Sequence, residues 1–195
     1  IDRWTFVHPK DVQDQRVPVT SQDILAGLPF VAGCKLWFDH HLSERQRLGG
    51  SIAYSGESRY ADSCARIIYE YYDGEFRLPR FQALVDEVDR IFSRRLSREE
   101  MLEPAGWALI ALLTDPRSGF GRFHDFTISN YQLMDKLVEL CRTPDPNDIL
   151  ANPDVMARIE LYRNTTVHFP QMLRQHTRPQ GTVAITHLRA VPPIY

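Results

Sequence analysis

The sequence predicts an α/β fold in which a parallel sheet of few short strands is flanked by many helices. Three observations predict it. Segments with apolar residues at helical spacing outnumber strand-like runs, and those runs are short and almost wholly apolar, as in strands covered on both faces. A third is the run at residues 35–38 (KLWF), which is followed at once by Asp39, His40 and His41. An apolar run ending in polar residues is typical of the carboxyl end of a central parallel strand.

The expected strands are few. Residues 4–7 (WTFV), ended by His8 and Pro9, predict a short buried strand, and residues 36–38 predict a second. Residues 182–188 (TVAITHL) alternate as a strand does. Polar residues and Pro18 favour an irregular connection over 11–20. The glycine, serine and charge content of 42–56 favours a loop.

The expected helices follow from apolar spacing. The series Ser97 to Glu100 is a capping-box pattern, and Pro104 limits the helix that it starts. Residues 107–113 are nearly all apolar, so we expect that helix to be buried on all sides. The helical segments are 60–72, 81–92, 107–113, 128–141 and 155–175.

These elements predict a division of the chain. We expect a main domain over residues 1–150, a linker helix over 151–179, and the start of a truncated second domain over 180–195. The first residue is Ile1 and leads straight into a predicted strand, while the last predicted strand lies close to Tyr195. We therefore expect the sequence to be a fragment.

Composition limits the classes of function. Of 195 residues, 43% are hydrophobic and 25% charged, which is typical of a globular protein. The net charge of −2 gives no electrostatic reason to coat long duplex nucleic acid, and no apolar stretch is long enough to cross a bilayer. No secretory signal is visible. Three scattered cysteines show neither zinc-site spacing nor a disulfide framework, which predicts a cytoplasmic location.

The triplet Asp39-His40-His41 carries the strongest chemical signal. Imidazole and carboxylate together suit Mn, Fe, Co or Zn, and a strand end is where α/β sheets bind ligands. The alternative is that both histidines are ordinary polar residues of a surface loop. The apolar run directly before the triplet favours the metal site.

Residues 35–41 (KLWFDHH) resemble the signature of the DHH phosphoesterases, a family that includes pyrophosphatases, exopolyphosphatases, single-strand exonucleases, oligoribonucleases and cyclic-dinucleotide phosphodiesterases. The nearest resemblance is to bacterial exopolyphosphatase-related proteins. The main domain is thus similar to the N-terminal domain of that family, and 180–195 to the start of its second, DHHA1-like domain. Further similar segments are 4–11 (WTFVHPKD), 65–72 (ARIIYEYY), 97–107 (SREEMLEPAGW), 119–123 (GFGRF) and 128–134 (ISNYQLM).

The resemblance implies roles for individual residues. It makes His40 a ligand of a divalent metal, His41 a contact to substrate phosphate, and Asp39 a ligand or a supporting partner. The family also has a later aspartate, at a helix end, that bridges two metals. Asp89 fits that position, and Asp115 is a second candidate. For Asp115 the alternative is a simple helix stop before proline.

Two departures from the family pattern concern the same site. The family's first motif, a His/Asp-x-Asp cluster after the first strand, is not in this sequence and would precede residue 4. The family's second motif is an aspartate in the strand before the triplet. Asp23 is available there, but the alignment equally places Gly27 at that position, and Asp23 could instead cap a turn.

A glycine-rich stretch at residues 118–121 is flanked by Arg117 and Arg122. Backbone N–H groups and guanidinium groups of this kind bind phosphate, so both arginines are candidate substrate contacts. The alternative is a surface turn.

The leading functional hypothesis is hydrolysis of a phosphoanhydride or phosphodiester bond with two divalent ions, Mn²⁺ first and Mg²⁺ or Co²⁺ next. Polyphosphate, short single-stranded oligonucleotides and small nucleotides are the expected substrates. A homodimer is one oligomeric state that the sequence leaves open. The fragment alone is expected to be inactive. The competing hypotheses are a non-catalytic nucleotide-binding or regulatory module and a helical interaction domain with an accidental triplet.

Overall fold

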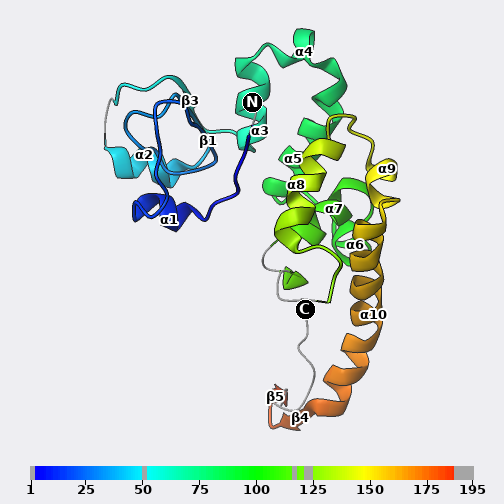
Figure 1. Cartoon of the computed structure of the whole chain (residues 1–195). Coiled ribbons are helices and arrows are strands. Elements are labelled where there is room, and N and C mark those ends of the chain that lie inside the picture. The colour runs from blue at the N-terminus through cyan, green and yellow to red at the C-terminus, as the bar shows by residue number, and fades with distance from the viewer. Residues whose placement is uncertain (1–2, 50–51, 116–117, 121–124, 187–195) are drawn as a thin grey trace. The chain divides into compact units, whose positions relative to one another are not determined.

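The computed structural model describes residues 3–49, 52–115, 118–120 and 125–186. The chain forms two compact units, Ile1–Glu103 and Pro104–Tyr195, and each is described by itself (Figure 1). The boundary between the units thus follows Glu103. The division at residues 150 and 179 that the sequence suggested stays a prediction about domains.

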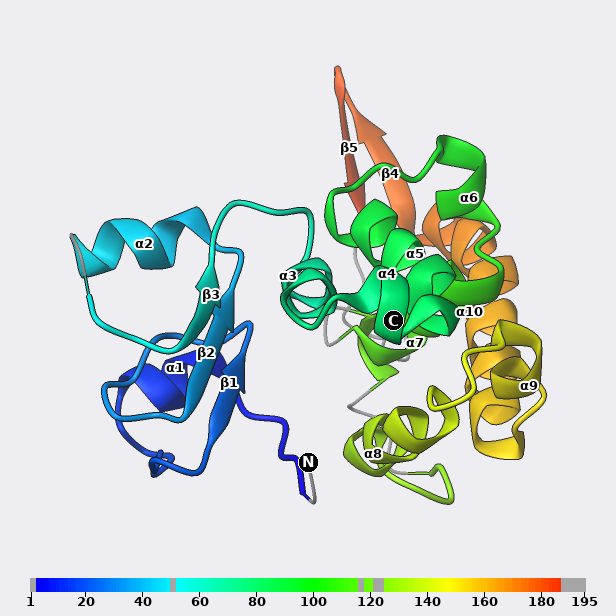
Figure 2. The same cartoon turned by 90° about the horizontal axis from the view of Figure 1, so that it is seen from above.

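The first unit contains a three-stranded parallel sheet in the order β1-β2-β3, formed by β1 (Ile24–Ala26), β2 (Leu36–Asp39) and β3 (Gly56–Ser58). Ile24 pairs with Leu36, and Trp37 pairs with Gly56. Figure 2 shows the three strands side by side and pointing the same way. This sheet and the many helices around it confirm the predicted α/β class.

The central strand β2 is buried, as its apolar sequence requires. Trp37 and Phe38 are each 1% exposed. The Trp37 indole N–H donates to the Leu28 carbonyl at 2.9 Å, and its ring packs against Phe30 and Tyr54. Burying one such side chain stabilises the fold by roughly 1.5–3 kcal/mol, so the strand that carries the triplet is firmly anchored.

Helices supply the rest of the first unit, and the predicted segments 60–72 and 81–92 are confirmed as α3 and α5. The first begins at the cap Ser63, later than predicted, and the capping box of Ser97 with Glu100 is present. The helices are α1 (Pro9–Gln13), α2 (Leu42–Leu48), α3 (Cys64–Tyr71), α4 (Gly74–Arg77), α5 (Gln82–Phe92) and α6 (Arg98–Leu102), with a 3-10 turn at Pro79–Phe81.

Two expectations about the first unit were wrong. Residues 4–7 form no strand; they run as irregular chain into α1, whose N-terminus is capped by His8. The loop expected over 42–56 instead contains α2 and the start of β3. Helix α2 forms because the buried Glu44 carboxylate accepts from the Phe30 N–H at 2.7 Å and from Arg47, and Gly49 ends the helix in the left-handed conformation.

Within its described residues, the regular elements of the second unit are helices and one hairpin. Its core lies between α7, α8, α9 and α10, and its largest buried side chains include Leu113, Leu133, Ile149 and Val155. Helix α7 is fully buried at Leu109, Ile110 and Leu113, and its other residues are half-buried, so it is less completely buried than its sequence predicted. The elements are α7 (Gly106–Thr114), α8 (Asn130–Leu140), α9 (Pro146–Leu150), α10 (Pro153–His176), β4 (Thr177–Gln180) and β5 (Val183–Thr186).

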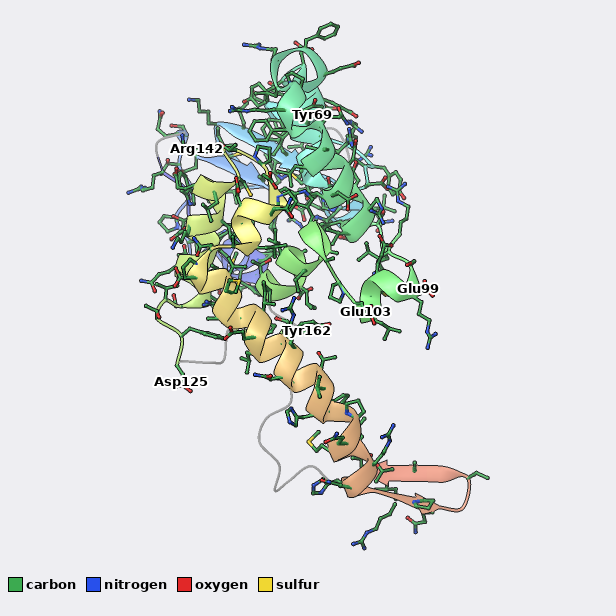
Figure 3. The ribbon with its side chains drawn as sticks, turned by 90° about the vertical axis from the view of Figure 1, so that its right-hand side faces the viewer. Tyr69, Glu99, Glu103, Asp125, Arg142 and Tyr162 are labelled. Carbon is green, nitrogen blue, oxygen red and sulfur yellow. The ribbon has the colours of Figure 1, made fainter. Side chains whose placement is uncertain are left out.

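Helix α10 is 24 residues long and leads into the antiparallel β4–β5 hairpin, as Figure 3 shows. It matches the long helix predicted over 155–175, and β5 matches the last predicted strand. Among the described residues, no helix combines the length and the apolar character that a membrane span requires.

A buried arginine holds the start of α10 to the rest of the second unit. The Arg158 guanidinium donates to the side-chain oxygen of Asn130 and to the carbonyls of Asp154 and Ile128, at 2.7–2.9 Å. It also lies over the Phe126 ring, 4.1 Å from the centroid. Burial lowers the pKa of Arg158, and these contacts offset the cost of removing the charge from water.

Candidate metal and phosphate site

The triplet occupies the carboxyl edge of the sheet. Asp39 is the last residue of β2 and is 1% exposed, while His40 and His41 follow it and lead into α2. Since ligands of parallel α/β sheets bind beyond the carboxyl ends of the strands, the triplet stands where a site is expected.

The three side chains converge. Each offers a ligand atom, and these atoms lie within 4.8 Å of one another. One oxygen of the Asp39 carboxylate is 2.7 Å from the His41 Nδ1, and the other accepts from the His41 backbone N–H at 3.1 Å. Where Nδ1 donates to the carboxylate in this contact, Nε2 is the ring nitrogen left to face a ligand.

His40 has the chemistry of a metal ligand. Its Nδ1 is buried and has no hydrogen-bond partner among the described residues. Burial and the neighbouring His41 lower the pKa of His40, while the charges of Asp39 and Asp89 act in the opposite direction. The imidazole is therefore neutral near pH 7, which is the form that binds metals. A carboxylate and imidazole groups together fit a divalent transition ion.

Asp89 lies near His40. It is carried by α5 and is 6% exposed, and Phe92 on the same helix packs edge-on against the His40 ring, with centroids 6.5 Å apart. Both carboxylate oxygens of Asp89 are occupied, one by the Ser63 hydroxyl at 2.6 Å and the other by the Arg66 Nε at 2.7 Å. The structure thus brings Asp89 near the triplet, but its carboxylate is hydrogen-bonded to Ser63 and Arg66 and not to the triplet.

Asp23 is not brought to this edge. Asp23 lies just before the amino end of β1, where its carbonyl accepts from the Lys35 N–H. Lys35 itself lies four residues before Asp39 on the neighbouring parallel strand. At ~3.3 Å per residue this separates Asp23 from Asp39 by about 13 Å. Its carboxylate accepts from the Thr20 hydroxyl and N–H, both at 2.7 Å, and these bonds lower the pKa of Asp23. Asp23 thus caps the turn before β1, and a metal-binding role for it stays a prediction.

The carboxyl end of β1 is occupied by Gly27. Its N–H donates to the Phe38 carbonyl at 2.9 Å, so it lies directly beside the residue before Asp39. Of the two alignments that the sequence allowed for the second motif, the geometry agrees with the one that places Gly27 there. This position therefore offers no carboxylate.

The remaining predicted residues lie elsewhere. Asp115 belongs to the second unit, where it is the half-buried C-cap of α7. Arg117 and Arg122 lie outside the described residues. The predictions for all three stay predictions.

Sequence reasoning missed Ser58, Ser63 and Arg66. Ser63 was detectable as the cap before a helical run, but its bond to Asp89 joins residues far apart in sequence. Ser58 pairs with Asp39 across the sheet, and its buried hydroxyl has no hydrogen-bond partner among the described residues. Only the strand register reveals that proximity. Burial raises the pKa of the neighbouring Cys64 thiol to about 11, so the thiol keeps its proton at neutral pH.

Comparison with solved structures finds a match over the whole chain. A pGpG-specific phosphodiesterase, PggH from Vibrio cholerae, aligns with a TM-score of 0.77 and 36% sequence identity. The alignment covers 100% of this chain and 62% of that one, so this chain spans less than two thirds of that protein. No family model and no curated protein matches. The match supports the DHH phosphoesterase assignment, but not the closer resemblance to exopolyphosphatase-related proteins.

Proposed function

We propose that this chain belongs to a metal-dependent DHH phosphoesterase that cleaves the phosphodiester bond of a small nucleotide of the pGpG kind. The observation that carries the proposal is the convergence of Asp39, His40 and His41 at the carboxyl edge of the sheet. It is supported by the 36% identity, along the full chain, to a pGpG-specific phosphodiesterase.

The residues of the triplet take different roles in this proposal. Asp39 and His40 hold a divalent ion, and Asp39 also fixes the His41 ring through the 2.7 Å contact. His41 would donate the N–H of its Nε2 to an oxygen of the substrate phosphate and so stabilise negative charge there. When bound, two divalent ions, with Mn²⁺ as the first choice, supply a Lewis acid and an activated water.

Asp89 fits a supporting role better than that of a bridging ligand. Both oxygens of Asp89 accept hydrogen bonds, and the Arg66 guanidinium that binds one of them is a cation that competes with a metal ion for the carboxylate. Breaking the bond to a half-buried guanidinium to free an oxygen is costly. We therefore assign Asp89 to holding α5, and with it Phe92, against His40. Asp115 is left as the sequence-based candidate for the bridging ligand.

Changing Asp89 to asparagine tests this assignment. The variant loses the charged bond to Arg66, so we expect the free energy of unfolding to fall by about 2–3 kcal/mol, with Mn²⁺ affinity reduced less than about 3-fold. If Asp115 is a metal ligand, Asp115→Asn should instead lower the Mn²⁺ affinity strongly and change the free energy of unfolding little. Urea unfolding in chelator and calorimetric Mn²⁺ titration measure the two effects, with Asp86→Asn as the exposed control. A loss of Mn²⁺ affinity above 100-fold in Asp89→Asn, with stability unchanged, contradicts the supporting role.

The function itself is tested on the full-length protein. We expect cleavage of pGpG to GMP with Mn²⁺, weaker cleavage with Mg²⁺, and none after chelation with EDTA. Polyphosphate and pyrophosphate, assayed in parallel, separate a phosphodiesterase from a phosphoanhydride hydrolase. Release of phosphate from polyphosphate without cleavage of pGpG contradicts the proposed substrate class.

One observation favours a second candidate function, a nucleotide-binding module without turnover. Gly27 occupies the carboxyl end of β1, so the position offers no ligand for a metal. A site with fewer carboxylates holds two cations less tightly. Binding of pGpG without cleavage, under conditions where Mn²⁺ binding is saturated, would select this alternative.

A further inference from the structure

An exposed tyrosine follows the strand next to the triplet. Tyr60 is 78% exposed and comes two residues after Ser58, the last residue of β3. Ser58 is the register partner of Asp39, and the ladder continues one step beyond β3, since the Arg59 N–H donates to the Asp39 carbonyl at 3.2 Å. Tyr60 therefore emerges at the same sheet edge as the metal-binding cluster.

The register also indicates on which side Tyr60 lies. Paired residues of parallel strands project to the same face, and residues two apart on one strand share a face. Continuing the ladder past Arg59 puts Tyr60 on the side of Ser58 and Asp39. With strands ~4.8 Å apart and ~3.3 Å per residue, the Cα atoms of Tyr60 and Asp39 are about 8 Å apart.

The backbone at this corner is held by ion pairs. The Arg59 guanidinium contacts Glu57, at 2.6 Å, and Glu70 on α3. It also donates to the Tyr60 carbonyl at 3.5 Å. Arg59 is thus occupied by two carboxylates, which makes it a poor phosphate ligand but fixes the chain from which the Tyr60 ring projects.

We propose that Tyr60 is a specificity-determining residue whose ring stacks on the base of a nucleotide whose phosphate is held at Asp39-His40-His41. The inference rests on the proposed function and adds the group that distinguishes a nucleotide from a plain phosphate. A large exposed aromatic ring within a nucleotide's length of a phosphate site is the arrangement used for base stacking. Stacking uses the π face common to all bases, so Tyr60 selects for a base and not for one base over another.

The test compares two ligands that the protein does not turn over. With Mn²⁺ present, Tyr60→Ala is expected to weaken GMP binding roughly 5- to 100-fold and leave binding of inorganic phosphate within about 2-fold. Tyr60→Phe keeps the ring and should restore GMP affinity. Phe76→Ala is the matched control, because Phe76 is an aromatic residue of α4 in the same unit and 87% exposed. Calorimetric titration gives both affinities, and thermal unfolding should not change because both rings are exposed.

Each outcome decides the inference. Equal losses for GMP and phosphate, or unchanged GMP affinity, overturn it. So does a loss of the same size in Phe76→Ala. If the wild-type protein binds GMP but cleaves no pGpG, the proposed activity fails, while the ratio of GMP affinities in wild type and Tyr60→Ala still decides the role of Tyr60. If the wild-type protein does not bind GMP, both fail.

Discussion

Replacing His40 with alanine is expected to lower kcat/KM for Mn²⁺-dependent cleavage of pGpG by about 10³-fold or more, equivalent to roughly 4 kcal/mol of transition-state stabilisation. The reason is that His40 supplies the neutral, half-buried imidazole of the Asp39-His40-His41 cluster, and alanine offers no ligand atom in its place. Mn²⁺ content after dialysis should fall in parallel with activity.

The same change should have little effect on the metal-free fold. The His40 Nδ1 is buried and has no hydrogen-bond partner within the part of the chain that the structure describes. Its removal therefore deletes an unsatisfied polar atom, which offsets the lost contact with Phe92. We expect the free energy of unfolding in EDTA to stay within about 1 kcal/mol of wild type. His168→Ala is a suitable control, since His168 is exposed and contacts the Asn164 carbonyl within α10. Wild-type Mn²⁺ affinity in His40→Ala would remove His40 from the site.

The second large effect is expected at Gly56, where β3 begins. Gly56 has φ +109° and lies against the backbone of Trp37 in the central strand. A Cβ atom added there would stand 2.8 Å from the Trp37 nitrogen and closer still to its carbonyl oxygen. Backbone atoms of a buried strand cannot move aside as a flexible side chain can. Gly56→Ala should therefore destabilise the first unit by about 3 kcal/mol or more.

The measurement is urea or thermal unfolding of wild type and variant, followed by tryptophan fluorescence, because Trp37 reports on the first unit. Gly49→Ala separates steric contact from backbone strain. Gly49 also has positive φ, +64°, but an added Cβ would meet nothing within 4 Å, so a cost of only about 1 kcal/mol is expected. Equal losses in the two variants would show that the close approach to Trp37 does not govern stability at Gly56.

Local sequence signals predicted the elements well where the cause of the structure is local. The apolar spacing of residues 81–92 is enough to form α5, and the reciprocal bonds of Ser97 and Glu100 depend only on residues three apart. The polar residues that follow 36–38 likewise mark the carboxyl end of a buried strand. The strand prediction for residues 4–7 was wrong because strand propensity forms a strand only beside a pairing partner, and residues 4–7 pair with no strand among the described residues.

The sequence by itself determined the α/β class, the family resemblance and the position of Asp39-His40-His41 at a strand end, since each depends on residues close together in the chain. Only the tertiary structure decided which carboxylates accompany the triplet. The parallel register places Asp23 at the amino end of the strands and Gly27 beside the carboxyl end of β2. The packing of α5 against α3 lets Ser63 and Arg66 donate hydrogen bonds to the carboxylate oxygens of Asp89. These relations depend on strand register and helix packing between distant segments, which no local pattern encodes.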